Sequence, residues 1–77
     1  MKNIVYYGAD WCPDCQRTKG YLKSRDIEFK EVDVAKEEVA AEIVQRINNG
    51  KRIIPTLIID GMPHANPSLQ DLAQLVE

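Results

Sequence analysis

The feature that most constrains this chain is a pair of cysteines placed where a strand is expected to give way to a helix. Cys12 and Cys15 are the two cysteines of the sequence, and they stand in the motif Trp11-Cys12-Pro13-Asp14-Cys15, directly after a short apolar run. Pro13 suits the first turn of a helix, where its missing N–H is no loss. The positive end of a helix dipole favours a thiolate at such a position. The motif therefore predicts two thiols side by side at the start of a helix.

Length and charge narrow the class of protein. With 77 residues, the chain is near the lower end of what folds alone, so we expect residues 1–77 to form a single domain. No stretch approaches the ~18 apolar residues of a membrane span, and no signal-peptide pattern follows Met1. The net charge of -2 gives no attraction to nucleic acid or anionic lipid. We therefore expect a soluble, cytoplasmic protein that binds neither nucleic acid nor a membrane.

Hydrophobic patterning predicts the element order βαβαββα. Strands are expected over 2–7, 27–34, 53–59 and 62–65, and helices over 13–25, over 36–48 and from 68 onward. Pro55 interrupts the third strand, so its pairing must begin after the proline or at an edge. Asp60-Gly61 predicts a hairpin, and Gly20 weakens the first helix by ~1 kcal/mol relative to alanine. A first βαβ unit implies two parallel strands, to which the hairpin adds antiparallel ones.

Apolar stripes at helical spacing predict which faces of the later helices are buried. The stripe of the middle helix consists of Val39, Ala40, Ile43, Val44 and Ile47, and that of the last helix of Leu69, Leu72, Leu75 and Val76. Ser68, three residues before Asp71, resembles a capping box. Tyr6 and Tyr7 are expected to belong to the core and the sheet surface rather than to the chemistry.

The cysteine pair is compatible with several kinds of site. Tetrahedral zinc needs four ligands, and only His64 could join the pair. An iron–sulfur cluster takes four thiolates, which Cys12 from each of two chains and two small thiols could supply. Cysteines that merely pack seldom flank a proline at a helix start. In a reducing compartment such a pair is more often catalytic or metal-binding than a structural bridge.

Disulfide exchange needs one thiolate to attack a substrate and a second thiol to resolve the mixed disulfide. The spacing supplies both. We expect Cys12 to be the exposed nucleophile, facing the free N–H groups of Asp14 and Cys15. Cys15, one turn into the helix, is expected to be less exposed and less acidic. The carboxylates of Asp10 and Asp14 oppose a thiolate at Cys12, because a nearby negative charge disfavours the charged form.

The same residues carry a resemblance to a known family. The first strand, the motif from Trp11 to Cys15, the pair Ile54-Pro55 and Asp60-Gly61 before a closing helix together resemble a glutaredoxin over nearly the whole chain. Within that family the chain is most similar to mycoredoxins, through residues 48–56 and 66–68, and it is also similar to the glutaredoxin-like hydrogen donors of ribonucleotide reductase. The resemblance implies a thioredoxin-like α/β fold with a four-stranded mixed sheet flanked by three helices. It also implies thiol-disulfide oxidoreductase activity without a resident cofactor or metal.

The resemblance extends to the surroundings of the cysteines. In the family the proline that matches Pro55 is cis and lies beside the cysteines, which leaves the backbone of Ile54 free to pair with a bound peptide or thiol. A helix start at Ser68 could receive a carboxylate on its free N–H groups. The residues expected to bind substrate or thiol are Trp11, Pro13, Asp14, Ile54, Pro55, Ser68 and Leu69.

Two departures from the family pattern leave the electron donor open. Glutaredoxins commonly hold glutathione with a basic residue three places before the first cysteine and with a Gly-Gly pair, whereas this chain has Ala9 and Asn66-Pro67. The expected partners are proteins with disulfides or thiol mixed disulfides, and the expected reductant is glutathione, mycothiol or a thioredoxin-reductase-like flavoprotein. A monomer is expected, and the alternative function is an iron–sulfur cluster module bridged across a dimer.

Overall fold

Residues 2–77 of the chain are described by a computed structural model, whose elements follow the predicted order βαβαββα. The strands are β1 (Ile4–Gly8), β2 (Lys30–Asp33), β3 (Thr56–Ile59) and β4 (Met62–Ala65). The helices are α1 (Pro13–Ser24), α2 (Glu38–Ile47) and α3 (Leu69–Val76). No helix within residues 2–77 has the length and apolar character needed to cross a membrane.

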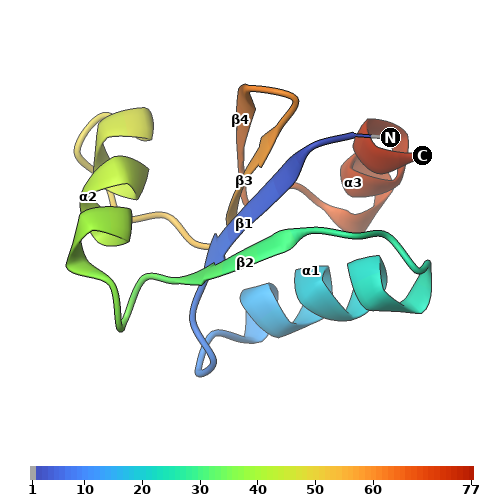
Figure 1. Cartoon of the computed structure of the whole chain (residues 1–77), viewed down its shortest axis with the longest axis horizontal. Helices are drawn as coiled ribbons and strands as arrows, with labels where there is room; N and C mark the ends of the chain where they lie inside the picture. The colour runs from blue at the N-terminus through green and yellow to red at the C-terminus, as the bar shows by residue number, and fades with distance from the viewer. Residues whose placement is uncertain (1) are drawn as a thin grey trace.

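The four strands form one mixed sheet in the order β2-β1-β3-β4. β1 pairs with β2 in parallel, and the other neighbours are antiparallel. Figure 1 shows α2 on one side of the sheet and α1 with α3 on the other. The four-stranded mixed sheet flanked by three helices is therefore confirmed, and the carboxyl end of β1 leads directly to the cysteine motif.

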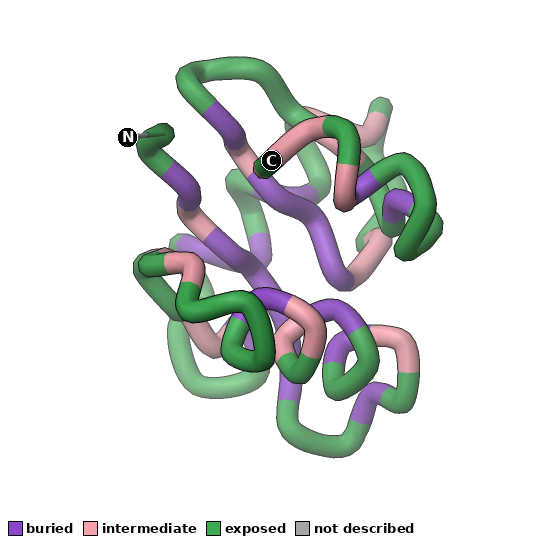
Figure 2. Tube along the Cα trace, turned by 90° about the vertical axis from the view of Figure 1, so that its right-hand side faces the viewer, coloured by how far each residue is buried: buried purple, intermediate pink, exposed green. Residues whose placement is uncertain are grey.

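The core lies on both faces of this sheet, because successive residues of a strand point to opposite sides. Tyr6 packs with Leu22 and Leu57 on the side of α1 and α3, whereas Tyr7 packs with Val44 on the side of α2. Figure 2 shows the buried segments following the strands through the middle of the molecule. Both tyrosines are thus buried, as their place in an apolar strand predicted.

The predicted strand over 27–34 is too long at both ends. Its first paired residue is Lys30, opposite Val5, and its last is Asp33, opposite Gly8. Residues 27 and 28 lie outside the strand because β1 begins only at Ile4, which in this register lies level with Phe29, where the pairing has not yet begun. Gly8, predicted to belong to a loop, extends β1 instead, and α2 is shorter than the predicted helix over 36–48.

The predicted buried stripes are partly wrong. On α2, Val39 is 69% exposed and Ile43 is 37% exposed, whereas Ala40, Ala41 and Val44 are buried. The buried face is centred on small residues because they let α2 pack close to the sheet. The phase of the stripe is therefore rotated away from Val39.

On α3, Leu72 is fully buried, but Leu69 remains 37% exposed in the first helical turn. Ser68 is the N-cap of this helix, and its Oγ accepts a hydrogen bond of 3.1 Å from the N–H of Asp71. The predicted cap is confirmed. Leu69 was predicted to face inward, but it is only partly covered, because the first turn of α3 lies at the edge of the packed face.

Gly8 is required by a close approach to the ring of Tyr6, two residues earlier on the same face of β1. A Cβ at Gly8 would lie 2.6 Å from Cζ of Tyr6 and closer still to its hydroxyl oxygen. In contrast, a Cβ at Gly20 on α1 would meet nothing within 4 Å. The structure therefore has no room for a side chain at Gly8 and has room for one at Gly20.

We expect Gly8→Ala to lower the free energy of unfolding by about 1–3 kcal/mol, because the added methyl overpacks the buried ring. The matched control Gly20→Ala should raise it by up to ~1 kcal/mol, because alanine is the better helix former and has room. Urea denaturation followed by circular dichroism measures both. Equal effects of the two substitutions would contradict the close approach at Gly8.

Candidate active site

Cys12 is the N-cap of α1, and its sulfur is held inward by the helix that it begins. Its backbone is extended, and its Sγ accepts a hydrogen bond of 3.2 Å from the N–H of Cys15. This N–H is among the free donors at the helix start and would serve a thiolate on the same atom. The expected contact with the N–H of Cys15 is confirmed.

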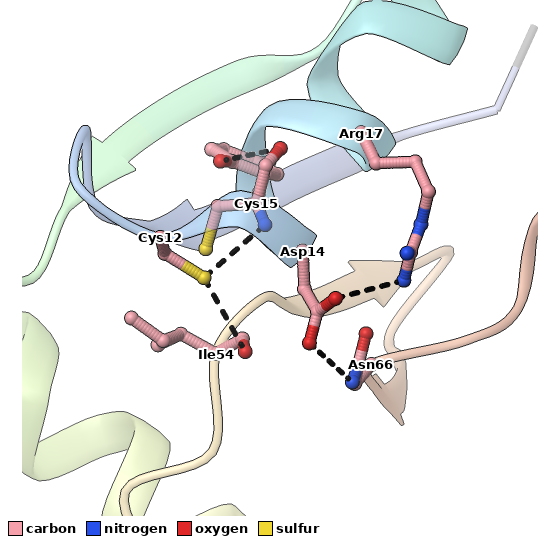
Figure 3. A network of polar contacts seen from close by, with 7 residues as sticks. Cys12, Asp14, Cys15, Arg17, Ile54 and Asn66 are labelled. Carbon is pink, nitrogen blue, oxygen red and sulfur yellow. Dashed lines mark hydrogen bonds and ion pairs between the residues drawn. The ribbon is translucent and has the colours of Figure 1, made fainter.

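Cys12 is less accessible than its predicted role suggested. Its residue is only 6% exposed, so the prediction of an exposed cysteine is wrong. The side chain turns toward the segment before Pro55, and the thiol donates a weak contact of 3.9 Å to the carbonyl oxygen of Ile54. Figure 3 shows the sulfur between the start of α1 and this segment.

Cys15 lies one turn into α1 and is fully buried. Burial raises the pKa of the Cys15 thiol to about 11, and its hydrogen bond with Cys12 acts in the same direction. Both cysteines are free thiols in this structure. The two sulfurs therefore have distinct surroundings, and Cys15 is the less exposed of the two and a weak acid, as its position in the helix predicted.

The peptide bond between Ile54 and Pro55 is cis, as the family resemblance implied. Hydrogen bonds hold both flanks of this bond. The carbonyl oxygen of Pro55 accepts a hydrogen bond of 2.7 Å from the N–H of Asn66, and the hydroxyl of Thr56 donates one of 2.6 Å to the carbonyl of Ile53. This segment thus forms a fixed wall beside Cys12, with Pro55 buried in it.

Asp14, between the two cysteines, links α1 to the loop before α3. Its Oδ1 accepts a hydrogen bond of 2.9 Å from Nη2 of Arg17, and its Oδ2 accepts one of 3.3 Å from Nδ2 of Asn66. We call these three side chains the Asp14 cluster, and Figure 3 shows the carboxylate of Asp14 between its two donors. The i,i+3 spacing of Asp14 and Arg17 is a signal readable from sequence, whereas the contact with Asn66 is not local.

The other residues predicted to bind a thiol have varied surroundings. Trp11 is 73% exposed beside Cys12, and Pro13 opens α1. Ser68 caps α3, so its hydroxyl is already engaged. Asn66, two residues before Ser68, is the residue of this loop that contacts the cysteine motif.

No metal-binding group accompanies the cysteine pair. Among residues 2–77, no three or more His, Cys, Asp and Glu side chains lie close enough to hold a metal ion. His64 stands on β4 and does not complete such a group with Cys12 and Cys15. The zinc site considered from the sequence therefore has no ligand set within this part of the chain.

Tyr6 is the contact of the cysteine pair that sequence reasoning missed. Its hydroxyl, buried inside the molecule, donates a hydrogen bond of 3.2 Å to the carbonyl oxygen of Cys15. The sequence signal for this contact is slight: a large polar-tipped residue in a buried strand, followed two positions later by Gly8.

Comparisons with known proteins agree with this geometry. The Glutaredoxin family matches residues 4–64 of the chain. Mycoredoxin 1 of Corynebacterium glutamicum is 37% identical over 79 aligned residues that cover 100% of this chain and 96% of the relative. Glutaredoxin 3 of Escherichia coli is 33% identical over 78% of this chain and 71% of its own. The crystal structure of the thioredoxin-like protein BC3987 matches with a TM-score of 0.82 and 30% identity, covering 95% of this chain and 99% of that one. This chain therefore belongs to the glutaredoxin family of thiol-disulfide oxidoreductases.

Proposed function

We propose that the chain reduces protein disulfides and mixed disulfides between proteins and small thiols, with Cys12 as nucleophile and Cys15 as resolving thiol. The observation that carries this proposal is the hydrogen bond from the N–H of Cys15 to the Sγ of Cys12 at the start of α1. A donor aimed at a cysteine sulfur at a helix start stabilises a thiolate there. Cys15 is buried one turn further on, and this burial disfavours its thiolate.

The reaction then runs in two exchange steps. The thiolate of Cys12 attacks one sulfur of the substrate disulfide, a bond forms between that sulfur and Sγ of Cys12, and the other substrate sulfur leaves as a thiolate. The thiolate of Cys15 next attacks Sγ of Cys12, releases the second substrate sulfur as a thiolate and leaves a Cys12–Cys15 disulfide. The substrate gains two electrons and takes up two protons, and an external reductant later returns the pair to thiols.

The wall beside Cys12 supports a mode of substrate binding. The carbonyl of Ile54 faces the sulfur of Cys12, and the neighbouring Trp11 exposes its apolar ring to solvent. An extended peptide or small thiol linked to Cys12 would meet the backbone at Ile54 on one side and the ring of Trp11 on another. Neither contact depends on the identity of the substrate's side chains, which suits an enzyme that reduces many different disulfides.

The Asp14 cluster bears on which small thiol is accepted. Its carboxylate already engages Arg17 and Asn66, two donors that an anionic ligand would otherwise use. We therefore propose a neutral small thiol, of which mycothiol is one, as the preferred co-substrate over glutathione, which carries carboxylates. The similarity to mycoredoxin 1 supports a small-thiol reductant in preference to a flavoprotein reductase.

Substitution of each cysteine tests the assignment of roles. We expect Cys12→Ser to abolish turnover, because no nucleophile remains. Cys15→Ser should retain the first exchange step and accumulate a mixed disulfide with the substrate, detectable by mass spectrometry. The assay compares mycothiol, glutathione and thioredoxin reductase as electron donors. Unchanged turnover in Cys12→Ser would disprove the proposal, and an iron–sulfur chromophore with stoichiometric sulfide in anaerobically purified protein would favour the cluster alternative.

Small disulfides of different charge test the role of Asp14. We expect Asp14→Asn to raise kcat/KM about two- to fivefold for the anionic disulfide of mercaptopropionate, because Arg17 becomes available and a negative charge is lost; this corresponds to the free energy of an exposed ion pair. The neutral hydroxyethyl disulfide measures any change in the Cys12 thiolate itself, and relative to its rate kcat/KM for the cationic disulfide cystamine should fall.

Asp26→Asn is the matched control for this series, since it makes the same change in net charge at the opposite end of α1. It should leave all three rates near those of the original chain. If both substitutions shift the rates alike, net charge rather than the Asp14 cluster decides the preference.

A further inference from the structure

The hydroxyl of Tyr6 lies directly beneath the buried cysteine, at a depth that solvent does not reach. Tyr6 is 2% exposed and Cys15 is 0% exposed. The hydroxyl donates a hydrogen bond of 3.2 Å to the carbonyl oxygen of Cys15, so the phenol of a strand residue contacts the helix residue whose thiol must react. The mechanism above gives this contact no role.

Three features hold the phenol in this position. Gly8 leaves open the space beside the hydroxyl that any Cβ would fill. The ring of Phe29 meets the ring of Tyr6 edge to face, with centroids 5.7 Å apart. Leu22, Leu57 and Leu72 surround the same core and are fully buried. A tyrosine fixed by packing on all sides has its hydroxyl direction set by the core, and only the O–H bond itself can turn.

During the resolving step Cys15 must form a thiolate, which hydrogen-bond donors stabilise. A thiolate in a buried site is disfavoured by desolvation, and burial raises the pKa of the Cys15 thiol to about 11. Two hydrogen-bond partners act against this rise and lower the pKa of Cys15: first the backbone of Ala9, and after it the hydroxyl of Tyr6. Burial also raises the pKa of Tyr6 far above its ordinary range, so the phenol keeps its proton and donates.

We propose that Tyr6 is a positioning residue for the resolving step: its O–H turns from the carbonyl of Cys15 toward the sulfur when that sulfur becomes a thiolate, and this donated hydrogen bond stabilises the attacking species. The inference rests on the proposed function, because it assigns a task to the same Cys15. Tyr6 forms no bond with the substrate and gives up no proton.

The groups that face these two residues are few. Cys12 at the start of α1 and Tyr6 on β1 are the titratable groups that act on Cys15. Tyr6 in turn is influenced by Cys15, by Glu31 on β2 and by Cys12. The backbone of Ala9 also forms a hydrogen bond that favours the Cys15 thiolate. Because Cys12 is covalently blocked in the mixed disulfide, Tyr6 is the side chain among these groups that can add a second donor at the moment of attack.

The two exchange steps can be observed separately with dithiobis(nitrobenzoate), whose released thiolate is coloured. In the reduced protein, attack by Cys12 releases the first equivalent of colour and attack by Cys15 releases the second. Rapid mixing combined with a pH jump gives the rate of each phase from neutral pH up to the pKa of about 11 for Cys15. The variant is Tyr6→Phe, and the matched control is Tyr7→Phe, which removes the same oxygen on the opposite face of β1.

In Tyr6→Phe the first phase should be unchanged and the second about threefold slower at neutral pH. Losing a hydrogen bond to a charged group lowers the thiolate fraction about tenfold or more, and the greater nucleophilicity of a more basic thiolate offsets part of this loss. The difference should shrink as the pH approaches the pKa of Cys15. Tyr7→Phe should leave both phases unchanged.

Each other outcome counts against the inference. A second phase that is slowed by the same factor at every pH would show that Tyr6 only anchors the helix through the carbonyl of Cys15. An unchanged second phase would remove Tyr6 from the mechanism while leaving the proposed function intact. Absence of the first phase, or of the second phase in the unmodified protein, would overturn the proposed function and this inference together.

A second substitution guards against misfolding of Tyr6→Phe. Fluorotyrosine inserted specifically at position 6 keeps the ring and strengthens the O–H as a donor. It should accelerate the second phase at neutral pH and leave the first unchanged. A second phase that does not respond to the strength of the donor would contradict the proposed hydrogen bond to the Cys15 sulfur.

Discussion

The hydrogen bond from the N–H of Cys15 to the sulfur of Cys12 is the interaction on which the site depends. It exists because Cys12 is the N-cap of α1, and α1 begins there because Pro13 cannot extend a strand but fits a first helical turn. The parallel pairing of β1 with β2 and the packing of α1 on the sheet then fix where this helix start lies. The start of α1 thus gives two chemically identical thiols different surroundings: the sulfur of Cys12 caps the helix, and the sulfur of Cys15 is fully buried one turn further on.

The remaining parts of the site arrive from distant segments of the chain. The segment at the cis bond Ile54–Pro55 places a backbone carbonyl beside Cys12. Asn66 contacts this segment through its main-chain N–H, which donates to the carbonyl of Pro55. The side chain of Asn66 donates to Asp14 at the start of α1. These links join the start of α1, the segment before β3 and the loop before α3. These links are polar, and two of the residues they join, Cys12 and Pro55, are buried. Hydrogen bonds therefore set the arrangement of the site, and the core beneath makes it rigid.

The element order and the chemistry could be predicted from the sequence because both are local signals. A cysteine pair around Pro13 and an Asp60-Gly61 turn act within a few residues, and the sheet follows from the strands they separate. The exposure of Val39 could not be predicted, since it depended on how closely small residues let α2 approach the sheet. The contact of Asn66 with Asp14 and that of Tyr6 with Cys15 join residues whose proximity only the folded chain creates.

The low exposure of Cys12 has a consequence for how the protein withstands oxidants. Thiols that sense peroxide are both acidic and open to solvent, and the same openness lets them pass from sulfenic to irreversible sulfinic and sulfonic acids. Here 6% of Cys12 and none of Cys15 meets solvent. Cys12 thus offers an oxidant in solution little surface to meet, whereas in the reaction proposed above a disulfide bound at Ile54 would be held next to the recessed thiol. Burial of the pair would therefore favour exchange with a bound disulfide, which is reversible, over repeated reaction with peroxide, which ends in the irreversible sulfinic and sulfonic acids.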